Sequence, residues 1–175
     1  MRYAMILTFA AMIACAAIDI ELVATGGPSF PTGQWGNSLS TGVDIGLSAS
    51  WIITPSLKVG GGINGSVFGS TDQGSASLTL MKPGINAGYY LRPWGNVFNP
   101  GIECGFGICR SSLRNGDGAD PVSWDPFWRV GMRWDFSMGA GFRGRVGTDY
   151  SSVLGEKETG DSFILLFGIS REVTL

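Results

Sequence analysis

Residues 41–53 read TGVDIGLSASWII, and every second side chain in this stretch is apolar. The odd-numbered positions from Val43 to Trp51 are aliphatic or aromatic, whereas the even-numbered ones are Asp44, glycine and serine. This period of two predicts a β-strand with one apolar face, because successive side chains of a strand point to opposite sides. The pattern resumes at Leu57 after the short segment Thr54-Pro55-Ser56, so the two runs together predict a β-hairpin.

The same alternation recurs along the rest of the 175-residue chain and predicts eight strands. Most of the runs are 10–14 residues long, whereas strands of globular proteins usually have about five or six residues. A tilted strand that crosses a membrane needs about nine to eleven residues, so the lengths favour a membrane protein. The predicted strands are Ile18–Ala24, Thr41–Ile53, Leu57–Phe68, Leu78–Leu91, Val97–Ile108, Phe127–Phe136, Met138–Asp149 and Ser162–Thr174.

Long and short connections alternate along the chain. The long, polar ones are Gly26–Ser40, Gly69–Ser77, Cys109–Pro126 and Tyr150–Asp161, and the tight ones are Thr54–Ser56, Arg92–Asn96 and the region from Asp135 to Met138. This order is typical of an up-and-down barrel that has loops at one rim and tight turns, with both termini, at the other. Pro83 and Pro100 fall inside predicted strands and cannot donate to the ladder, so we expect bulges or local breaks there.

The two faces of the strands differ in charge. The face that carries Val43, Ile45 and Leu47 has no charged side chain through these stretches, as contact with hydrocarbon requires. The other face combines glycine with charged residues, because the interior of an eight-stranded barrel is just wide enough for side chains. The chain is therefore predicted to be all-β, an eight-stranded antiparallel up-and-down transmembrane β-barrel. The alternative, the wet outer face of a soluble barrel, predicts abundant Lys and Glu with less glycine.

Buried charges need partners, so the charged interior face predicts an ion-pair network. Together with Asp19, Glu21 and Glu172, the acids and bases on this face balance at six each. The predicted network consists of Asp44, Lys58, Lys82, Glu103, Arg129, Arg133, Asp135, Arg143 and Arg145.

Aromatic residues gather near the strand ends, which is typical of side chains at the two membrane interfaces. A soluble core would not favour strand ends. Beside the short turns lie Trp51, Tyr89, Trp94, Phe98, Trp134 and Phe136, and near the opposite ends lie Trp124, Phe127 and Trp128.

The first residues have the pattern of an export signal. Arg2 supplies a positive charge, Tyr3–Ile13 is an apolar run, and Ala14–Ala17 offers small residues for cleavage. We therefore predict a signal peptide at residues 1–16 and a barrel at residues 17–175. The alternative, acylation of Cys15 in a lipobox-like Met12–Cys15, stays open.

Several classes of site are excluded or disfavoured by composition. The chain has no histidine, which excludes Ser-His-Asp and Cys-His catalysis and the usual His-containing zinc sites. Its net charge of −2 gives no electrostatic footprint for binding nucleic acid. Cys104 and Cys109 are predicted to point to opposite faces, beyond disulfide reach. Gly60–Gly65 matches G-x-G-x-x-G without a following helix, and Asn115–Asp120 lacks the order of a calcium loop. We expect no cofactor and no metal.

The pattern resembles the small eight-stranded outer-membrane barrels of bacteria, the family of the OmpA transmembrane domain and OmpX. The resemblance rests on the loop alternation and on the stretches 42–47, 57–62 and 84–90 and the closing run Phe163 to Ile169. It implies the outer membrane as location with both termini in the periplasm, and outer-membrane lipids and the assembly machinery as partners. Family members commonly end on an aromatic residue, whereas this chain ends on Leu175 and carries Arg171 in the apolar parity.

Three functions remain, from three different classes. The first is a structural or surface-interaction protein that meets an unknown extracellular ligand through its loops, chiefly Gly26–Ser40 and Cys109–Pro126. The second is a narrow passive pore for ions or small solutes, which the four interior arginines should obstruct. The third is a membrane-embedded lipid-modifying enzyme, which would lack its ordinary histidine base. We therefore expect a surface-interaction protein without enzymatic activity.

Overall fold

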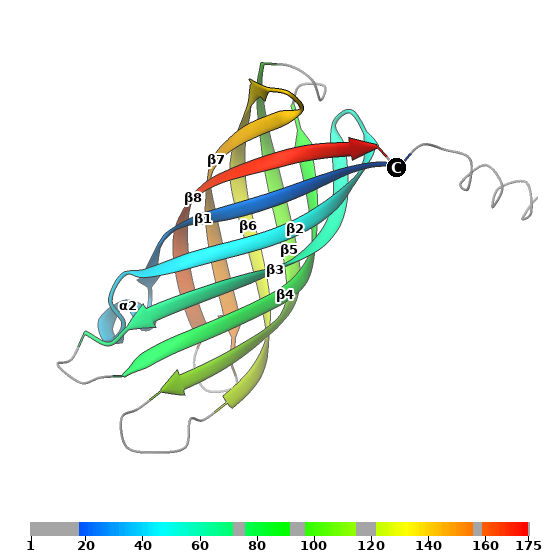
Figure 1. Cartoon of the computed structure of the whole chain (residues 1–175). Coiled ribbons are helices and arrows are strands. Elements are labelled where there is room, and N and C mark those ends of the chain that lie inside the picture. The colour runs from blue at the N-terminus through cyan, green and yellow to red at the C-terminus, as the bar shows by residue number, and fades with distance from the viewer. Residues whose placement is uncertain (1–17, 72–75, 92–96, 115–121, 156–158, 175) are drawn as a thin grey trace, which may run out of the picture.

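The computed structural model describes residues 18–71, 76–91, 97–114, 122–155 and 159–174, and these form a closed barrel of eight antiparallel strands in sequence order (Figure 1). The predicted fold class is confirmed. No helix in the described residues is long and apolar enough to cross a membrane. The elements are β1 Asp19–Thr32, α2 Trp35–Ser38, β2 Gly42–Thr54, β3 Leu57–Gly69, β4 Ser77–Tyr90, β5 Phe98–Arg114, β6 Val122–Gly139, β7 Phe142–Leu154 and β8 Thr159–Thr174.

The pairing register gives the tilt of the barrel. A row of paired residues starts at Phe142 in β7, passes Arg171, Leu22, Ala49, Gly61, Ile85, Phe106 and Trp128, and returns to β7 at Ser152. The row is therefore displaced by ten residues along β7, since 152 − 142 = 10. With eight strands, a rise of about 3.3 Å per residue and a spacing of about 4.8 Å, this shear tilts the strands by about 40°.

Several strands are longer than the sequence predicted. β1 continues from Ala24 to Thr32 through two prolines, and β5 and β6 add the segments 109–114 and 122–126, which were expected to be loop. The predicted strand ends were placed where the alternation of apolar and polar residues stops. That alternation is required only where the strand contacts an apolar medium, whereas the backbone hydrogen bonds between strands continue further along the chain. The rim of the barrel that carries the long connections is hereafter called the loop end. Because the strands extend further there, these connections are shorter than predicted.

The turn between β6 and β7 was placed too early in the chain. It was expected between Asp135 and Met138, but β6 runs to Gly139, and Asp135 is a buried strand residue. The chain reverses at Gly139, Ala140 and Gly141, which all have positive φ values, of 88°, 52° and 76°. Glycine adopts this left-handed region without the steric cost of a Cβ atom, so the Gly-Ala-Gly sequence fixes the turn here.

The expectation of a bulge or local break is confirmed at Pro83 and wrong at Pro100. The register shifts in the ladder lie between Ile52 and Thr54 and between Ser137 and Gly139, both next to tight turns. Pro100 pairs with Trp134 in an unbroken register. At Pro83 the pairing with β5 stops for two residues and resumes in the same register, so only a local break occurs.

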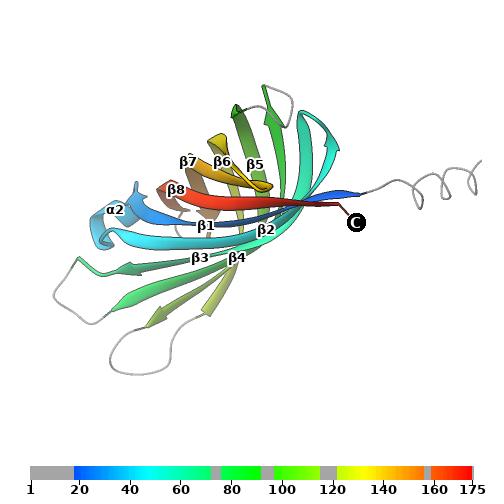
Figure 2. The same cartoon turned by 45° about the horizontal axis from the view of Figure 1, so that its top comes forward.

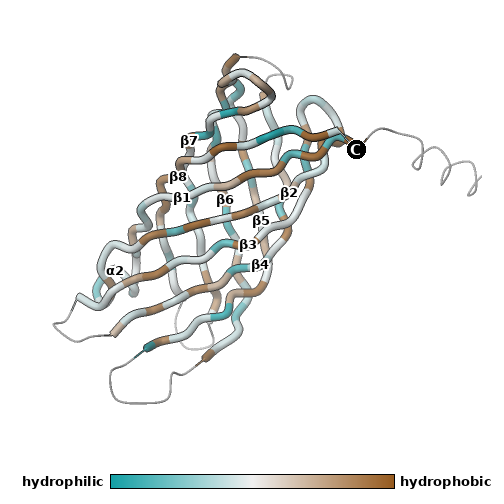
Figure 3. Tube along the Cα trace, viewed as in Figure 1, coloured by the Kyte–Doolittle hydropathy of each residue, from teal (hydrophilic) through white to brown (hydrophobic). Residues whose placement is uncertain are grey.

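The outer surface is apolar, as predicted. Hydrophobic and hydrophilic residues alternate along the strands (Figure 3), and the large apolar side chains from Val43 in β2 to Ile169 in β8 point outward and are exposed. Trp51, Tyr89, Trp128, Trp134 and Phe136 lie on this outer face, whereas Trp94 falls outside the described residues. Phe127 is a correction, since it is buried inside the barrel instead of joining an outer belt.

Candidate functional site

The rim where β1 begins and β8 ends is hereafter called the terminus end. Charged side chains of strands β1 to β7 line the interior of the barrel from this end to its middle. The ion pairs involve five acids and five bases, so the set is neutral as a whole. Such balance is required of charges removed from water. The members are Glu21, Asp44, Glu103, Asp135 and Asp149 with Lys58, Lys82, Arg129, Arg133 and Arg145. We call this set the ionic network.

Arg145 joins the terminus end of the ionic network. Its Nε lies 2.7 Å from Asp135 Oδ1, and its Nη2 lies 3.2 Å from Glu21 Oε1. The same Nη2 donates to the Tyr90 hydroxyl at 3.1 Å. Lys58 Nζ pairs with Glu21 Oε2 at 2.5 Å and lies 3.9 Å from the centre of the Tyr90 ring. One guanidinium thus holds side chains of β1, β4 and β6 against β7.

Glu103 occupies the middle of the network. Its Oε1 is 3.2 Å from Arg129 Nη2, and its Oε2 is 3.3 Å from Arg133 Nε. The Asn86 amide also donates to Oε1, at 3.0 Å. On the far side, Arg133 Nη2 donates to Asp149 Oδ2 at 2.8 Å. Arg129 and Arg133 each pair with more than one carboxylate. These charge-assisted hydrogen bonds are strong because the barrel interior has a low dielectric constant.

A smaller unit lies nearest the loop end. Lys82 Nζ is 3.3 Å from Asp44 Oδ2, which also accepts a hydrogen bond from the Ser66 hydroxyl. Asn64 connects this pair to the rest, because its Nδ2 donates to Asp44 and its Oδ1 accepts from Arg129 at 3.1 Å. The ionic network is thus continuous from Glu21 to Lys82.

Glycines make room for the long side chains. Arg133 pairs across the ladder with Gly147, and a Cβ at either Gly131 or Gly147 would collide with the Arg133 side chain. A Cβ at Gly105 would lie 3.0 Å from Arg129 Nε. Gly105, Gly131 and Gly147 thus leave space that the side chains of Arg129 and Arg133 occupy.

Eight of the nine residues of the predicted network take part in these ion pairs, and the ninth, Arg143, is also buried on the inner face. Asp19 and Glu172 lie half-buried at the terminus rim. The prediction missed Asp149, which shares the parity of Arg145 and could have been found by extending the alternation. It also missed Tyr90 and Asn64 as hydrogen-bond partners.

The interior near the loop end is apolar, which the sequence analysis did not anticipate. Phe68, Leu80, Cys109, Phe127 and Val153 form a buried cluster, hereafter the apolar plug. These residues share the inward parity of the charged ones, so the alternation contained the signal. The short helix α2 lies at the loop end of the barrel (Figure 2), where Trp35 and Leu39 pack against the plug. Trp35 meets Phe68 edge to face at 6.2 Å between ring centres.

Backbone hydrogen bonds hold α2 over the barrel. The Ser40 amide donates to Gly69 O at 2.8 Å, and the Thr71 amide donates to Ser38 O at 3.1 Å. Gly160 in β8 leaves the space that the Trp35 indole occupies, because a Cβ there would overlap the ring. The first long connection is thus fixed to the segment after β3 and to β8.

Beside α2 the loop end opens into a cavity of about 830 Å³, hereafter the mouth cavity. Its apolar lining includes Trp35, Leu39, Leu78, Leu113, Trp124 and Val153, and its polar lining includes Gln34, Ser111, Ser123 and Asp125. Most of these residues belong to the two segments predicted to meet a ligand, 26–40 and 109–126.

A hydroxyl chain crosses one wall of the mouth cavity. The Ser123 hydroxyl donates to Asp125 Oδ2 at 2.5 Å, and it lies 2.7 Å from the Ser111 hydroxyl. Because Ser123 has one proton to donate, Ser111 is the donor in the second contact. The wall therefore presents hydrogen-bond acceptors and one carboxylate to the cavity.

The lumen below the plug is filled. Two interior cavities between the network side chains, one against Arg133 and Arg145 and one against Lys82 and Asp149, measure about 10 Å³ each. A volume of that size holds about one water molecule. The mouth cavity and the network are therefore separated by packed side chains in the described part of the barrel.

Cys104 is exposed on the outer face and Cys109 is buried in the plug, so the prediction that they face opposite sides is confirmed. No group of His, Cys, Asp and Glu that could hold a metal ion occurs among the described residues. The segment Asn115–Asp120, weighed as a calcium loop, lies outside them.

The fold is that of the small eight-stranded outer-membrane barrels. Neisserial surface protein A superposes with a TM-score of 0.71 at 15% sequence identity, over 87% of this chain and 96% of that one. Ail of Yersinia pestis, in complex with the heparin analogue sucrose octasulfate, superposes with a TM-score of 0.62 at 9% identity, over 90% of this chain and all of that one. The predicted resemblance to this class of barrel is confirmed at the level of the fold.

An enzyme shares the same architecture. The outer-membrane enzyme PagL superposes with a TM-score of 0.50 at 22% identity, over 86% of this chain and 97% of that one. No protein-family model matches the sequence, and no curated protein matches it either. The likeness at these identities concerns the fold, so the function has to be argued from this chain's own residues.

Proposed function

We propose that this protein is an outer-membrane barrel that binds a ligand at its loop end and conducts no solute through its lumen. The apolar outer surface supports a position in the membrane, because so large an exposed apolar area is not tolerated in water. The mouth cavity above a filled lumen is the observation that carries the binding function. Both termini then face the periplasm and the long connections face outward.

The lining of the mouth cavity defines the ligand class. Trp35 and the aliphatic residues around it offer an apolar surface, and Asp125 is the charged side chain of the lining. An apolar or aromatic body with a cationic or hydrogen-bond-donating group complements this combination. A polyanion such as the sucrose octasulfate bound by Ail would be repelled by Asp125 at this position.

Binding is favoured over catalysis by the residues of the hydroxyl wall. Ser123 is hydrogen bonded to Asp125, but the chain has no histidine that could accept a serine proton as a general base. This chain therefore shares the architecture of PagL but has no histidine base of its own.

The closed lumen is tested by recording from single barrels in a planar lipid bilayer. We expect no steady conductance, since the ionic network and the apolar plug fill the interior. Glu103→Ala combined with Arg129→Ala serves as the positive control for a widened lumen. Steady sub-nanosiemens steps from the unmodified protein would favour the passive pore instead.

Ligand binding is tested with tryptamine, an aromatic amine, by saturation-transfer NMR on the full-length protein in lipid nanodiscs. We expect a saturable signal that Asp125→Asn and Trp35→Ala each reduce by roughly tenfold in affinity, from loss of a charged hydrogen bond or of the apolar surface. Asp19→Asn, at the opposite rim, is the matched control. Equal binding by all four proteins would exclude the mouth cavity as the site.

A further inference from the structure

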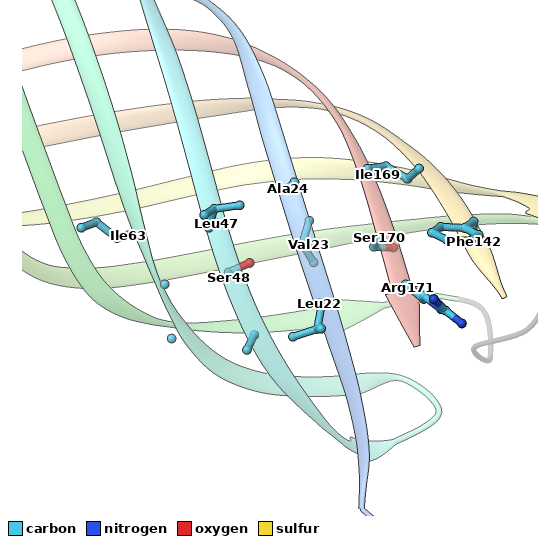
Figure 4. Close-up of a pocket in the computed structure, with 13 residues that line it drawn as sticks. Leu22, Val23, Ala24, Leu47, Ser48, Ile63, Phe142, Ile169, Ser170 and Arg171 are labelled. Atoms are coloured by element: carbon cyan, nitrogen blue, oxygen red, sulfur yellow. The ribbon is translucent and has the colours of Figure 1, made fainter. Parts of the chain in front are cut away.

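The outer wall of the barrel has a groove that the ligand site does not involve. Its volume is about 530 Å³, and it crosses β8, β1, β2 and β3 (Figure 4). The outward residues along its floor are small, namely Ala24, Ala49 and Gly61, and larger apolar side chains such as Leu47 and Ile63 border it. Most other outward positions of the wall carry large apolar side chains, so these three neighbouring small residues leave a local gap in the apolar surface.

The groove follows one row of the strand register. Arg171 pairs with Leu22, Leu22 with Ala49, and Ala49 with Gly61. Three strand spacings of about 4.8 Å make this row about 14 Å long. Because the strands are tilted, the row climbs from the terminus rim at Arg171 toward the middle of the barrel wall. In Figure 4, Phe142 and Arg171 lie at one end of the groove and Ile63 at the other.

Arg171 is the cation at the rim end of the groove. It points outward among apolar side chains and lies over the Phe142 ring, with its Cζ 5.1 Å from the ring centre. The salt bridges of the described residues do not include it. A guanidinium held at a membrane surface by its apolar stem is placed to bind phosphate oxygens.

We propose that the groove binds one phospholipid of the leaflet next to the chain termini, with an acyl chain along Ala49 and Gly61 and the phosphate on Arg171. An acyl chain fills the apolar gap, and the lipid phosphate complements the guanidinium charge. The proposal rests on the position of the barrel in the membrane and is independent of the mouth cavity.

A second copy of the chain fits the groove less well than a lipid. Two barrels in one membrane would be related by a twofold axis along the membrane normal, which places both Arg171 side chains at the same depth. Two like charges facing each other near a low-dielectric medium repel, whereas a phosphate attracts each of them.

The test measures how many phospholipids stay on the full-length protein. The protein is reconstituted in vesicles of phosphatidylethanolamine and phosphatidylglycerol, extracted in detergent and weighed by native mass spectrometry. We expect one retained phospholipid, and a retained fraction lower by roughly tenfold in both Arg171→Gln and Ala49→Leu, since either the phosphate contact or the space for the chain is lost.

Matched controls make the same changes outside the groove. Arg114→Gln removes an exposed outward arginine of β5 near the loop end, and Ala87→Leu enlarges an outward alanine of β4. Both should retain the lipid, and the heat-dependent gel mobility of each variant verifies that the barrel is folded. Retention by Arg171→Gln equal to that of the unmodified protein, or a dimer that Ala49→Leu abolishes, would overturn the proposal.

Discussion

The two ends of the barrel interior are filled by different chemistry on the same face of the strands. Toward the termini, Arg145 and its partners form the ionic network, and toward the loops, Phe68 and Phe127 belong to the apolar plug. The inward parity therefore decides only that a side chain is enclosed. The ionic network and the apolar plug occupy different levels along the strands, although apolar side chains such as Val23 and Leu166 also lie between the network residues.

The plug has a consequence for the network below it. Because α2 and the plug close the loop end, water reaches the network less easily, and its electrostatic interactions are strengthened by the low local dielectric. The same condition makes any unpaired charge costly. The comparison thus predicts that removing a charge from the ionic network, or side-chain volume from the apolar plug, lowers the free energy of unfolding.

The largest effect is expected for Glu103→Ala. The change leaves Arg129 and Arg133 without the carboxylate that they share, so the free energy of unfolding should fall by about 3–5 kcal/mol. Urea unfolding in lipid vesicles, followed by tryptophan fluorescence, measures it. If the variant does not fold, Glu103→Gln keeps the acceptor oxygen for Asn86 and removes only the charge.

The control for this change is Asp19→Ala. Asp19 lies at the terminus rim and accepts a hydrogen bond from the Thr174 hydroxyl, so its loss should cost less than about 1 kcal/mol. A similar cost for both acids would mean that the interior carboxylates are solvated.

The sequence was sufficient for the wall of the barrel but not for its contents. Alternation from Val43 to Ile169 identified the strands and their faces, because hydrocarbon excludes charge from the outward positions that it covers. The ion pairs depend on the shear, which joins Arg145 to Glu21 across 124 residues and leaves no local trace. The helix α2 was missed because its four residues, WGNS, carry no helical period.

A second prediction concerns the outer side of the same wall. Val130 in β6 faces outward at the middle of the wall, and Val130→Arg should lower the free energy of unfolding by about 2–4 kcal/mol. Val122→Arg makes the same change on the same face at the loop end, where a cost below about 1 kcal/mol is expected. Equal costs in vesicle unfolding would contradict the position of the membrane.

The smallest effect distinguishes enclosed volume from lipid contact on a single strand. Ile164 of β8 is buried inside the barrel with 3% of its surface exposed, whereas Ile169 faces outward with 44% exposed. Ile164→Val removes a methyl group from the packed interior and should cost about 0.5–1.5 kcal/mol.

Ile169→Val should stay within about 0.5 kcal/mol, because acyl chains fill the space that the methyl group leaves. Both values follow from urea unfolding in the same vesicles, and neither should depend on salt, since no charge is altered. If Ile169→Val lowers the free energy of unfolding as much as Ile164→Val does, side chains on the outer wall are packed as tightly as those inside the barrel. The contrast between enclosed side chains and those in contact with lipid would then lose its physical basis.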